Sequence, residues 1–533
     1  MNRFLAGIAA AMLGLGVVST DALAETPPDQ LVVATSLANV LTLDPADIVS
    51  REGAQVMNAV YETLVQIDPH DRSRIIPGLA ESWEISEDGR SITFHLREAN
   101  FASGNPVTAA DVVWSLTRLM SMNLAQASFL KTRGFTAETA AESFVALDER
   151  TFRLNLPKPD DPRLVMMVLA VGGTGAVIDH VEALRHEVDG DLAQGWLRLN
   201  SAGSGPYVVR EWRSNELILL ERNPNYWGEA PAMRRVLMRH LPESQTQRLQ
   251  LERGDIDIGY SLLSADLQGL EANPDVVVAS EPSAGFYYLG VSMKDERFAN
   301  PLVRRALAHL IDYEGLNRSV MPYFGQPHQR PIAAGVMGAL PDPGYRLDVE
   351  TARALLAEAG YPDGFDVTLR ALAEPPFINI ATALQATLAQ AGIRAEIITG
   401  SGDQIYGAMR ERNFELIVGR GGGGTIPHPD SNLRALVYNP DNSDEAALTN
   451  FQGWRTSFHD EELNRMIDEA LLVLDPEEQR EAYEAIQIRY DELAPSLMIF
   501  SQVVVSVAYR DDVEGLIIDP WHTRFQMIEK HRE

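Results

Sequence analysis

The stretch "ARALLAEAGYPDGFDVTLRALAEPPFINIATALQATLAQAGIRAEI", residues 352–397, changes its hydrophobic period three times. It begins with apolar residues at helical spacing, and Gly360 then supplies the backbone freedom that favours a helix end. Polar and apolar residues alternate over 365–369, which predicts a half-buried strand. A second helix is predicted over 382–391 and a second strand over 393–397. Because this rhythm extends from about 285 to 420, the sequence predicts an α/β fold.

Other segments carry their own boundary signals. Thr108 and Asp111 have the spacing of a capping box, which predicts a helix that starts after Thr108. Apolar residues at helical spacing predict another helix over 463–474, and the step Asp475-Pro476 predicts the cap of the next one. The alternating segments 91–97 and 151–156 predict two half-buried strands.

Composition excludes several classes of protein. The chain has 533 residues, enough for two or three domains, and its 45% hydrophobic and 23% charged residues are those of an ordinary globular protein. Its formal net charge is −30, with 75 acidic residues against 45 basic ones. The electrostatic field of so negative a protein repels nucleic acids and anionic membrane surfaces, which makes both poor partners.

The N-terminus has the layout of a secretory signal peptide. A basic start, Met1-Asn2-Arg3, precedes an apolar stretch over 4–18, and Ala22-Leu23-Ala24 provides a cleavage site before Glu25. The sequence contains no Cys, so it has neither disulfides nor a cysteine for lipid attachment. We therefore expect a signal peptide over 1–24 and a periplasmic protein of a Gram-negative bacterium without a membrane anchor; full secretion is the alternative.

A run of glycines raises the possibility of a nucleotide site. In "VGRGGGGTIPHPDSN", residues 418–432, three glycines fit the G-x-G-x-x-G pattern after an apolar segment. A dinucleotide loop must lead directly into a helix, and the two prolines that flank His428 disfavour a helix there. The sequence therefore favours a glycine loop at a strand end, where side chains would obstruct something, over a nucleotide site.

Catalytic and metal motifs are missing as well. The eleven His residues are scattered, no H-E-x-x-H occurs, and a zinc site built on Cys is excluded. The segment "GSGPY", 203–207, lacks the G-x-S-x-G spacing and predicts a turn before a strand. Asp255 and Asp257 fall on one side of an extended segment, which favours a solvated strand face over an acid/base pair. The sequence predicts no enzyme, no cofactor and no metal.

Several segments in order resemble one known family. They are "NPVTAADVVWSLTRL", "GSGPYVVREW", "ERNPNYWG", "RLQLERGDIDI", "FYYLGVSM", "LVRRALAHLID", "LLAEAGYPDGFDVTL", "LQATLAQAGIRAEI" and "DELAPSLMIF". Together they are similar to the extracytoplasmic solute-binding proteins of the peptide/nickel class, family 5, over a span from about Leu31 to the C-terminus. The resemblance implies a role as the periplasmic binding component of an ABC importer.

The resemblance also implies an architecture. Family members are two-lobed α/β proteins of the periplasmic-binding-protein (Venus-flytrap) type with an extra subdomain inserted in the first lobe. In this chain lobe I would comprise 25–288 and 500–533, with the insertion near 61–195, and lobe II would comprise 289–499. The two crossings between the lobes would lie at 287–290 and 498–500.

The glycine loop departs from the peptide-binding members of the family. In those proteins the loop typically carries Trp-x-x-Asp before a Pro-Asp step, and the Asp pairs with the α-ammonium of the peptide. Matching His428-Pro429-Asp430 to that step places Gly422 at the Trp and Thr425 at the Asp, so the anchor carboxylate is absent. A buried ammonium without it would be costly. The Arg that receives a dipeptide carboxylate is also absent from 373–377.

These departures predict a larger pocket for a less peptide-like ligand: an opine-like conjugate, an oligosaccharide or a modified peptide. Arg420 could donate to an anionic or polar group, or lie on the surface at a strand end. Phe451 and Trp454 could supply aromatic walls, or both could belong to the core. The predicted ligand-binding set is Leu37, Ala38, Asn39, Arg420, Gly421, Gly422, Gly423, Gly424, Thr425, Phe451 and Trp454.

The predicted partners are a small-molecule or short-oligomer ligand and the permease subunits of an ABC importer, and the protein is expected to be a monomer. A sensor or chaperone-like protein of the same fold is one alternative, and a secreted hydrolase is another. Binding of nickel or a metallophore would require clustered His residues or a chelator-shaped pocket, which the sequence does not single out.

Overall fold

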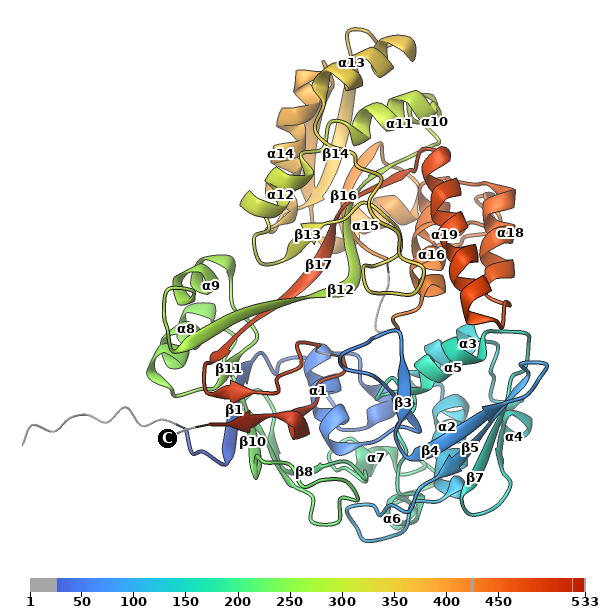
Figure 1. Cartoon of the computed structure of the whole chain (residues 1–533), viewed down its shortest axis with the longest axis vertical. Coiled ribbons are helices and arrows are strands. Elements are labelled where there is room, and N and C mark those ends of the chain that lie inside the picture. The colour runs from blue at the N-terminus through green and yellow to red at the C-terminus, as the bar shows by residue number, and fades with distance from the viewer. Residues whose placement is uncertain (1–25, 423–425, 520, 532–533) are drawn as a thin grey trace, which may run out of the picture.

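The computed structural model describes residues 26–422, 426–519 and 521–531. The predicted signal peptide and its cleavage site lie outside this part of the chain. The described residues form a mixed α/β protein with two lobes (Figure 1), as predicted. Within the described ranges, no helix combines the length and the apolarity that a bilayer crossing requires.

One large sheet extends through both lobes. In the described part of the chain it has eleven strands, in the order β15-β14-β16-β12-β17-β11-β1-β10-β9-β8, with β13 beside β17. The strands of this sheet are β1 (Gln30–Thr35), β8 (Tyr207–Arg213), β9 (Leu217–Arg222), β10 (Arg235–His240), β11 (Ile258–Gly259), β12 (Val276–Val291), β13 (Gly325–Pro327), β14 (Asp366–Leu372), β15 (Arg394–Gly400), β16 (Leu416–Gly421) and β17 (Leu497–Arg510).

Smaller sheets complete the lower lobe of Figure 1. A four-stranded sheet has the order β4-β5-β7-β6, and two pairs are β2-β3 and β18-β19. Their bounds are β2 (Val65–Ile67), β3 (Ile75–Pro77), β4 (Ala80–Ile85), β5 (Ser91–Leu96), β6 (Phe144–Ala146), β7 (Thr151–Asn155), β18 (Val513–Glu514) and β19 (Glu529–Lys530). β5 and β7 match the two alternating segments, so both predicted strands are confirmed.

Helices cover the sheets in both lobes. Those of the lower lobe are α1 (Arg51–Val60), α2 (Ala109–Ser121), α3 (Ala127–Thr132), α4 (Ala140–Ser143), α5 (Pro162–Leu169), α6 (His180–Leu184), α7 (Gln194–Leu197), α8 (Ser244–Arg253) and α9 (Ser264–Leu270), with 3-10 helices η1 (Pro45–Asp47) and η2 (Phe525–Met527). Those of the upper lobe are α10 (Glu296–Ala299), α11 (Pro301–Ala308), α12 (Tyr313–Ser319), α13 (Val349–Glu358), α14 (Phe377–Gln390), α15 (Gly402–Arg410), α16 (Pro429–Leu436), α17 (Gln452–Arg455), α18 (Glu461–Ala470) and α19 (Pro476–Glu492).

Two long strands join the lobes. β12 and β17 pair in antiparallel register from Val276 opposite Arg510 to Gly290 opposite Leu497. β16 extends the sheet beside the upper end of β12, and β11 extends it beside the lower end of β17. The pairing is irregular between Pro282 and Phe286, and its register shifts again between Tyr287 and Tyr288. An irregular ladder is a place where a two-stranded crossing can bend.

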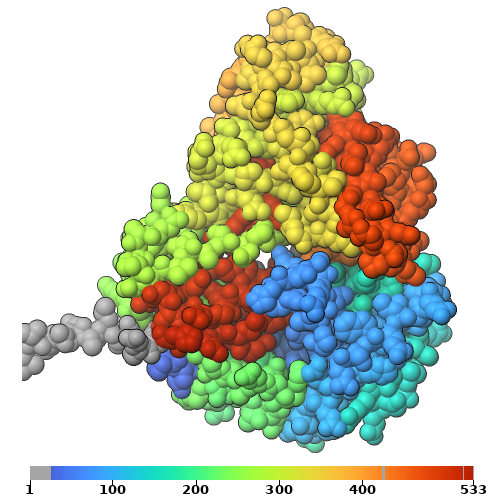
Figure 2. Space-filling view, in the orientation of Figure 1, coloured from blue at the N-terminus to red at the C-terminus, as the bar shows by residue number. Residues whose placement is uncertain are grey.

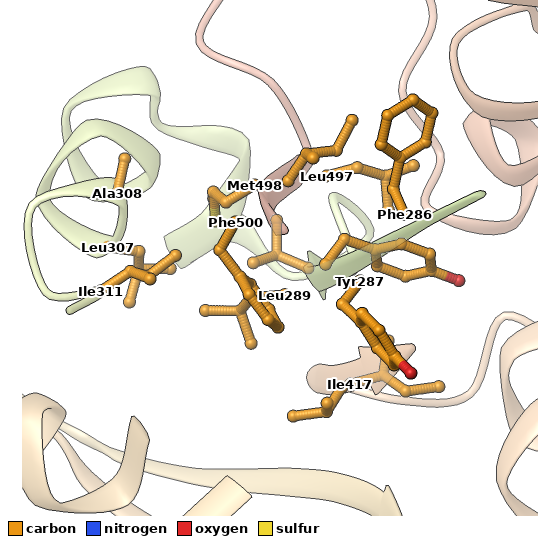
Figure 3. Close-up of a cluster of buried hydrophobic side chains, with 14 of the residues drawn as sticks. Phe286, Tyr287, Leu289, Leu307, Ala308, Ile311, Ile417, Leu497, Met498 and Phe500 are labelled. Atoms are coloured by element: carbon orange, nitrogen blue, oxygen red, sulfur yellow. The ribbon is translucent and has the colours of Figure 1, made fainter. Parts of the chain in front are cut away.

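The upper lobe has a core of its own, which anchors the upper halves of both crossing strands. Phe286, Tyr287 and Leu289 of β12 pack there with Met498 and Phe500 of β17 (Figure 3). All five side chains are buried. We therefore propose that the chain passes between the lobes at the irregular pairing near Pro282, before the crossing predicted at 287–290.

The predicted capping box at the start of α2 is confirmed. The backbone N–H of Thr108 donates to the Asp111 carboxylate at 2.8 Å, and the Thr108 hydroxyl donates to the same oxygen at 2.7 Å. The carboxylate also contacts Nδ1 of His180 at 2.6 Å. The box therefore ties the start of α2 to α6.

Replacing Thr108 with Ala should lower the free energy of unfolding by about 1 kcal/mol, because the cap loses its hydroxyl. Urea unfolding followed by circular dichroism measures the change. Thr108→Ser is the matched control, since it keeps the hydroxyl and should stay close to the parent protein. Equal losses in both variants would contradict the capping role.

Some predicted boundaries and one predicted surface are wrong. α14 begins at Phe377, ahead of the predicted start, and α18 ends at Ala470, so Leu474 lies outside it and is exposed. Asp257 is fully buried, where a solvated strand face was predicted: it contacts Lys530 at 2.9 Å and accepts the backbone N–H of Val32 at 2.7 Å. The partner Lys530 is remote in sequence, so the local pattern could not indicate burial.

Candidate functional site

The strand directions place the carboxyl end of β1, in the lower lobe, opposite the carboxyl end of β16, in the upper lobe. β12 runs from the lower lobe to the upper lobe, and β16 pairs with it in antiparallel register, so the end of β16 points to the lower lobe. β1 is parallel to β11, which is antiparallel to β17, so the end of β1 points to the upper lobe. Ligands of open α/β sheets bind outside the carboxyl ends of strands. The space between the lobes is therefore the candidate site.

A cavity of about 590 Å³ lies in this space beside the crossing strands, and we call it the hinge cavity. It is lined by the β2–β3 hairpin, by β12 near Pro282, by an upper-lobe loop around Gly335, and by residues 516–519 and His522. Figure 2 shows the opening where β12, the C-terminal segment and the blue hairpin meet between the lobes. The cavity thus has walls from both lobes and from the crossing itself.

Charged groups are concentrated on the lower wall of the hinge cavity. Arg72 donates from Nη1 to the carbonyl of Pro282 at 3.1 Å, and its Nη2 lies 3.3 Å from the Asp519 carboxylate. The same carboxylate contacts Nδ1 of His522 at 3.0 Å. Burial acts to raise the pKa of Asp519, but His522 and Arg72 outweigh it and hold that pKa below its ordinary value. Arg72 thereby links the lower lobe to the crossing strand.

The glycine loop begins where β16 ends. Gly421 pairs with Phe286 of β12, and Gly422 adopts φ +96, a left-handed conformation that suits glycine. A side chain on Gly421 would collide with Gln452, and one on Gly422 would collide with Leu436. The absence of side chains at these two positions therefore allows close packing inside the upper lobe.

The residues that follow the glycine loop, 426–428, are not helical, as the prolines predicted, and a helix begins only at the second proline. α16 begins at Pro429 with His428 as its N-cap, and the ring accepts the backbone N–H of Asp430 at 3.2 Å. Proline is favoured at the first helical position because it has no N–H to satisfy. His428, Pro429 and Asp430 are all buried, so the N-terminus of α16 packs against the protein itself.

The two lobes also touch on the side away from the crossing strands. Asp161 at the start of α5 lies 3.3 Å from Nε2 of His428 and accepts Nε2 of Gln479 at 2.8 Å. Burial acts to raise the pKa of Asp161, but His428 and Arg163 outweigh it and lower the pKa to about 2. Arg163 in turn donates to the carbonyl of Val473 at 3.0 Å. A polar contact thus closes the far side of the interlobe space.

A second cavity, of about 790 Å³, lies beside this contact. Apolar side chains of α3 and α5 face Ile426, Phe451 and Leu471 across it. The charged residues that line it are Arg133, Lys158, Arg434, Asp430 and Asp468. Pro427 lines the hinge cavity whereas Ile426 lines this one. The end of the glycine loop therefore separates the two hollows.

The predicted residues of the lower lobe are divided between core and surface. Leu37 is 1% exposed and packs in the core, and its N–H donates to Nδ1 of His240 at 2.9 Å. Ala38 and Asn39 are exposed at the end of β1. Asn39 lines a hollow of about 580 Å³ with Asp191 and Arg198 of the same lobe. The structure does not bring Leu37 to the interlobe space.

The predicted residues of the upper lobe are also divided. Arg420 is exposed on β16, and its N–H donates to the hydroxyl of Tyr406 at 3.1 Å. Phe451 lies edge-on to Tyr438 in the second cavity. Trp454 is 4% exposed and donates its indole N–H to the carbonyl of Ser443 at 2.8 Å, so it belongs to the core. Gly423, Gly424 and Thr425 lie outside the described residues.

The charged residues of the hinge cavity were missed at the sequence level. Arg72, Glu281, Asp519 and His522 come from three segments that are remote in sequence. The signal lies in their convergence, which only the tertiary structure provides.

Comparisons with known proteins agree with this architecture. The model of bacterial extracellular solute-binding proteins, family 5 Middle, matches residues 74–444. The probable D,D-dipeptide-binding periplasmic protein DdpA of Escherichia coli (strain K12) is 29% identical over 515 residues, with 93% of each chain covered. Among solved structures, HbpA2 from Haemophilus parasuis superposes with a TM-score of 0.82 at 22% identity, covering 94% of this chain and 100% of that one. AgaA from A. tumefaciens R10, in complex with agropinic acid, gives a TM-score of 0.68 at 25% identity, with 95% and 99% covered.

Proposed function

The chain belongs to family 5 of the bacterial extracellular solute-binding proteins, and we propose that it captures a peptide-like, opine-like or oligosaccharide solute between its lobes and delivers it to the permease of an ABC importer. The observation that carries this proposal is the hinge cavity, whose walls come from both lobes and from the crossing strands. A ligand in such a cavity contacts both lobes at once. It favours the closed form to the extent that it binds that form more tightly than the open one.

The proposal also covers the cellular location of the protein and its oligomeric state. The basic start, apolar stretch and A-x-A site support export and cleavage before Glu25. Its relatives include a periplasmic binding protein. We therefore place the mature protein in the periplasm as a monomer that returns its ligand unchanged and performs no covalent chemistry. Docking of the closed form on the permease completes the transport step.

A bound solute should stabilise the protein in proportion to its affinity. A probe at 100 times its dissociation constant should add about 2.7 kcal/mol to the free energy of unfolding if it binds only the folded state. A thermal-shift screen of residues 25–533 with alanine di- to pentapeptides, octopine and maltotriose measures this. If no probe of any class raises the melting temperature, the proposed capture of these solutes is wrong.

A variant that fills the hinge cavity tests its location. Ala334 is exposed and lines the cavity from the upper lobe. Ala334→Trp should abolish the thermal shift and leave the unliganded melting temperature close to that of the parent protein. Ala230→Trp is the matched control, because Ala230 is exposed on a loop of the lower lobe away from this cavity. An unchanged shift in Ala334→Trp would place the solute elsewhere.

A further inference from the structure

The hinge cavity has a strong excess of negative charge. Four carboxylates line it against one guanidinium: Asp68, Asp71, Glu281 and Asp519 against Arg72. Among the lining residues that the structure describes, no Phe, Tyr or Trp occurs. The described part of the wall therefore offers charged acceptors and no face of a Phe, Tyr or Trp ring on which a sugar ring could stack. A cation is the solute group that such a wall favours.

Glu281 differs from the other carboxylates of the cavity. Asp519 contacts Arg72 and His522, Asp68 accepts the backbone N–H of His70 at 2.9 Å, and Asp71 accepts the hydroxyl of Ser73 at 2.6 Å. Glu281 stands on β12 opposite Val505, and its side chain is exposed. Within the described part of the chain it has no ion pair and no side-chain hydrogen bond. Its carboxyl group is thus available to a ligand on the crossing strand itself.

His522 supplies a second acceptor. Its side chain is buried, with 4% exposed, and lines the same cavity. Its Nδ1 faces Asp519, whose ionised carboxylate can only accept, so Nδ1 carries the hydrogen. In the neutral ring the lone pair is therefore on Nε2, and this buried nitrogen has no hydrogen-bond partner among the described residues. A buried polar atom without a partner is unfavourable unless a ligand satisfies it.

We propose that the solute carries a protonated amine, which donates hydrogen bonds to Glu281 and to Nε2 of His522 in the hinge cavity. This inference rests on the proposed function and narrows it to amine-bearing solutes, such as peptides or opines, and away from neutral oligosaccharides. Arg72 keeps N–H groups that are not used by Pro282 or Asp519. It can therefore receive a carboxylate of the same solute, as a zwitterion requires.

The experiment compares paired probes by isothermal titration calorimetry. Alanyl-alanine and alanyl-alanyl-alanine are each titrated beside their N-acetylated forms, with octopine as the conjugate and maltotriose as the neutral probe. We expect a free-amine probe to bind at least 10-fold more tightly than its acetylated form. Glu281→Gln should lower the affinity for the free-amine probe by about 10- to 100-fold, which is the range expected for the loss of a hydrogen bond to a charged group.

The controls separate loss of recognition from loss of structure. Glu84→Gln changes an exposed carboxylate of β4 that lies away from the hinge cavity and should leave the affinity unchanged. His522→Asn removes the Nε2 acceptor and provides a second variant if Glu281→Gln does not fold. An acetylated probe that binds equally well, an unchanged affinity in both variants, or binding of maltotriose alone would overturn the inference while capture of a solute stands. Binding by no probe would overturn both.

Discussion

Replacing Arg118 with alanine should lower the free energy of unfolding by about 3–5 kcal/mol, the cost of leaving a buried charge without its partner. Arg118 lies on α2 of the lower lobe and is 1% exposed. Its Nη1 and Nη2 contact the two oxygens of Asp44 at 3.1 and 2.6 Å, and Asp44 is fully buried. The alanine variant removes both contacts and leaves the carboxylate in the interior.

The effect should extend to the end of β1. Asp44 accepts the backbone N–H of Ala46 at 3.1 Å and caps η1, and Arg118 also donates from Nε to the carbonyl of Leu192 at 2.9 Å. The pair therefore fixes the segment after Thr35 against the rest of the lower lobe. We expect faster hydrogen exchange over 37–50 in the alanine variant, with little change in the upper lobe.

Two variants test whether the buried charge is the cause. Arg185→Ala breaks a pair with Glu182 in which Arg185 is 62% exposed, and it should cost no more than about 1 kcal/mol, as exposed pairs do. The double variant Asp44→Leu with Arg118→Met replaces both charges with apolar groups and should recover much of the loss. Urea unfolding measures all three. A loss in Arg118→Ala as small as that in Arg185→Ala would contradict the prediction.

Local structure was predictable because its causes are local. The capping box of α2, the proline at the start of α19 and the alternation in β5 depend on residues within one or two turns of each other. The α/β fold follows from the same periodicities. Helix ends were less predictable: Leu474 continues the apolar stripe of α18 but lies beyond its last turn.

The candidate site was less predictable because it is assembled from remote segments. Leu37 and Trp454 are apolar in the sequence whether they line a pocket or a core, and the structure places both in cores. Glu281 and His522 line the same hinge cavity although they are far apart in sequence. The glycine loop attracted attention through its composition, but at Gly421 and Gly422 the missing side chains make room for Gln452 and Leu436.

The contribution of Glu62 to the free energy of unfolding should fall by up to about 3 kcal/mol as the pH rises from about 4.5 to above 7. Glu62 is 4% exposed, at the end of α1. Burial raises its pKa from 4.5 to about 7, although hydrogen bonds from Trp227 and Ser204 act against this. One of its carboxylate oxygens, Oε1, has no partner among the described residues.

The direction follows from which state binds the proton more tightly. Between pH 4.5 and 7 the folded protein keeps Glu62 protonated while the unfolded chain releases the proton, so each rise in pH favours unfolding. The stabilisation is complete below the unfolded pKa and is lost as the pH passes the folded pKa. Other groups that titrate in this window are common to the parent protein and its variants, so the difference between them isolates Glu62.

Glu62→Gln should remove this pH dependence. The glutamine oxygen can still accept from Trp227, which donates at 2.6 Å, and from Ser204, which donates at 3.1 Å, but the side chain has no charge to bury. The variant should therefore be the more stable protein at pH 8 and lose this advantage near pH 4.5. Melting temperatures of both proteins across this range, with Glu84→Gln as the exposed control, measure the difference. A constant difference between Glu62→Gln and the parent at every pH would show that Glu62 does not titrate in this window, and the proposed burial of a protonated carboxyl would then be wrong.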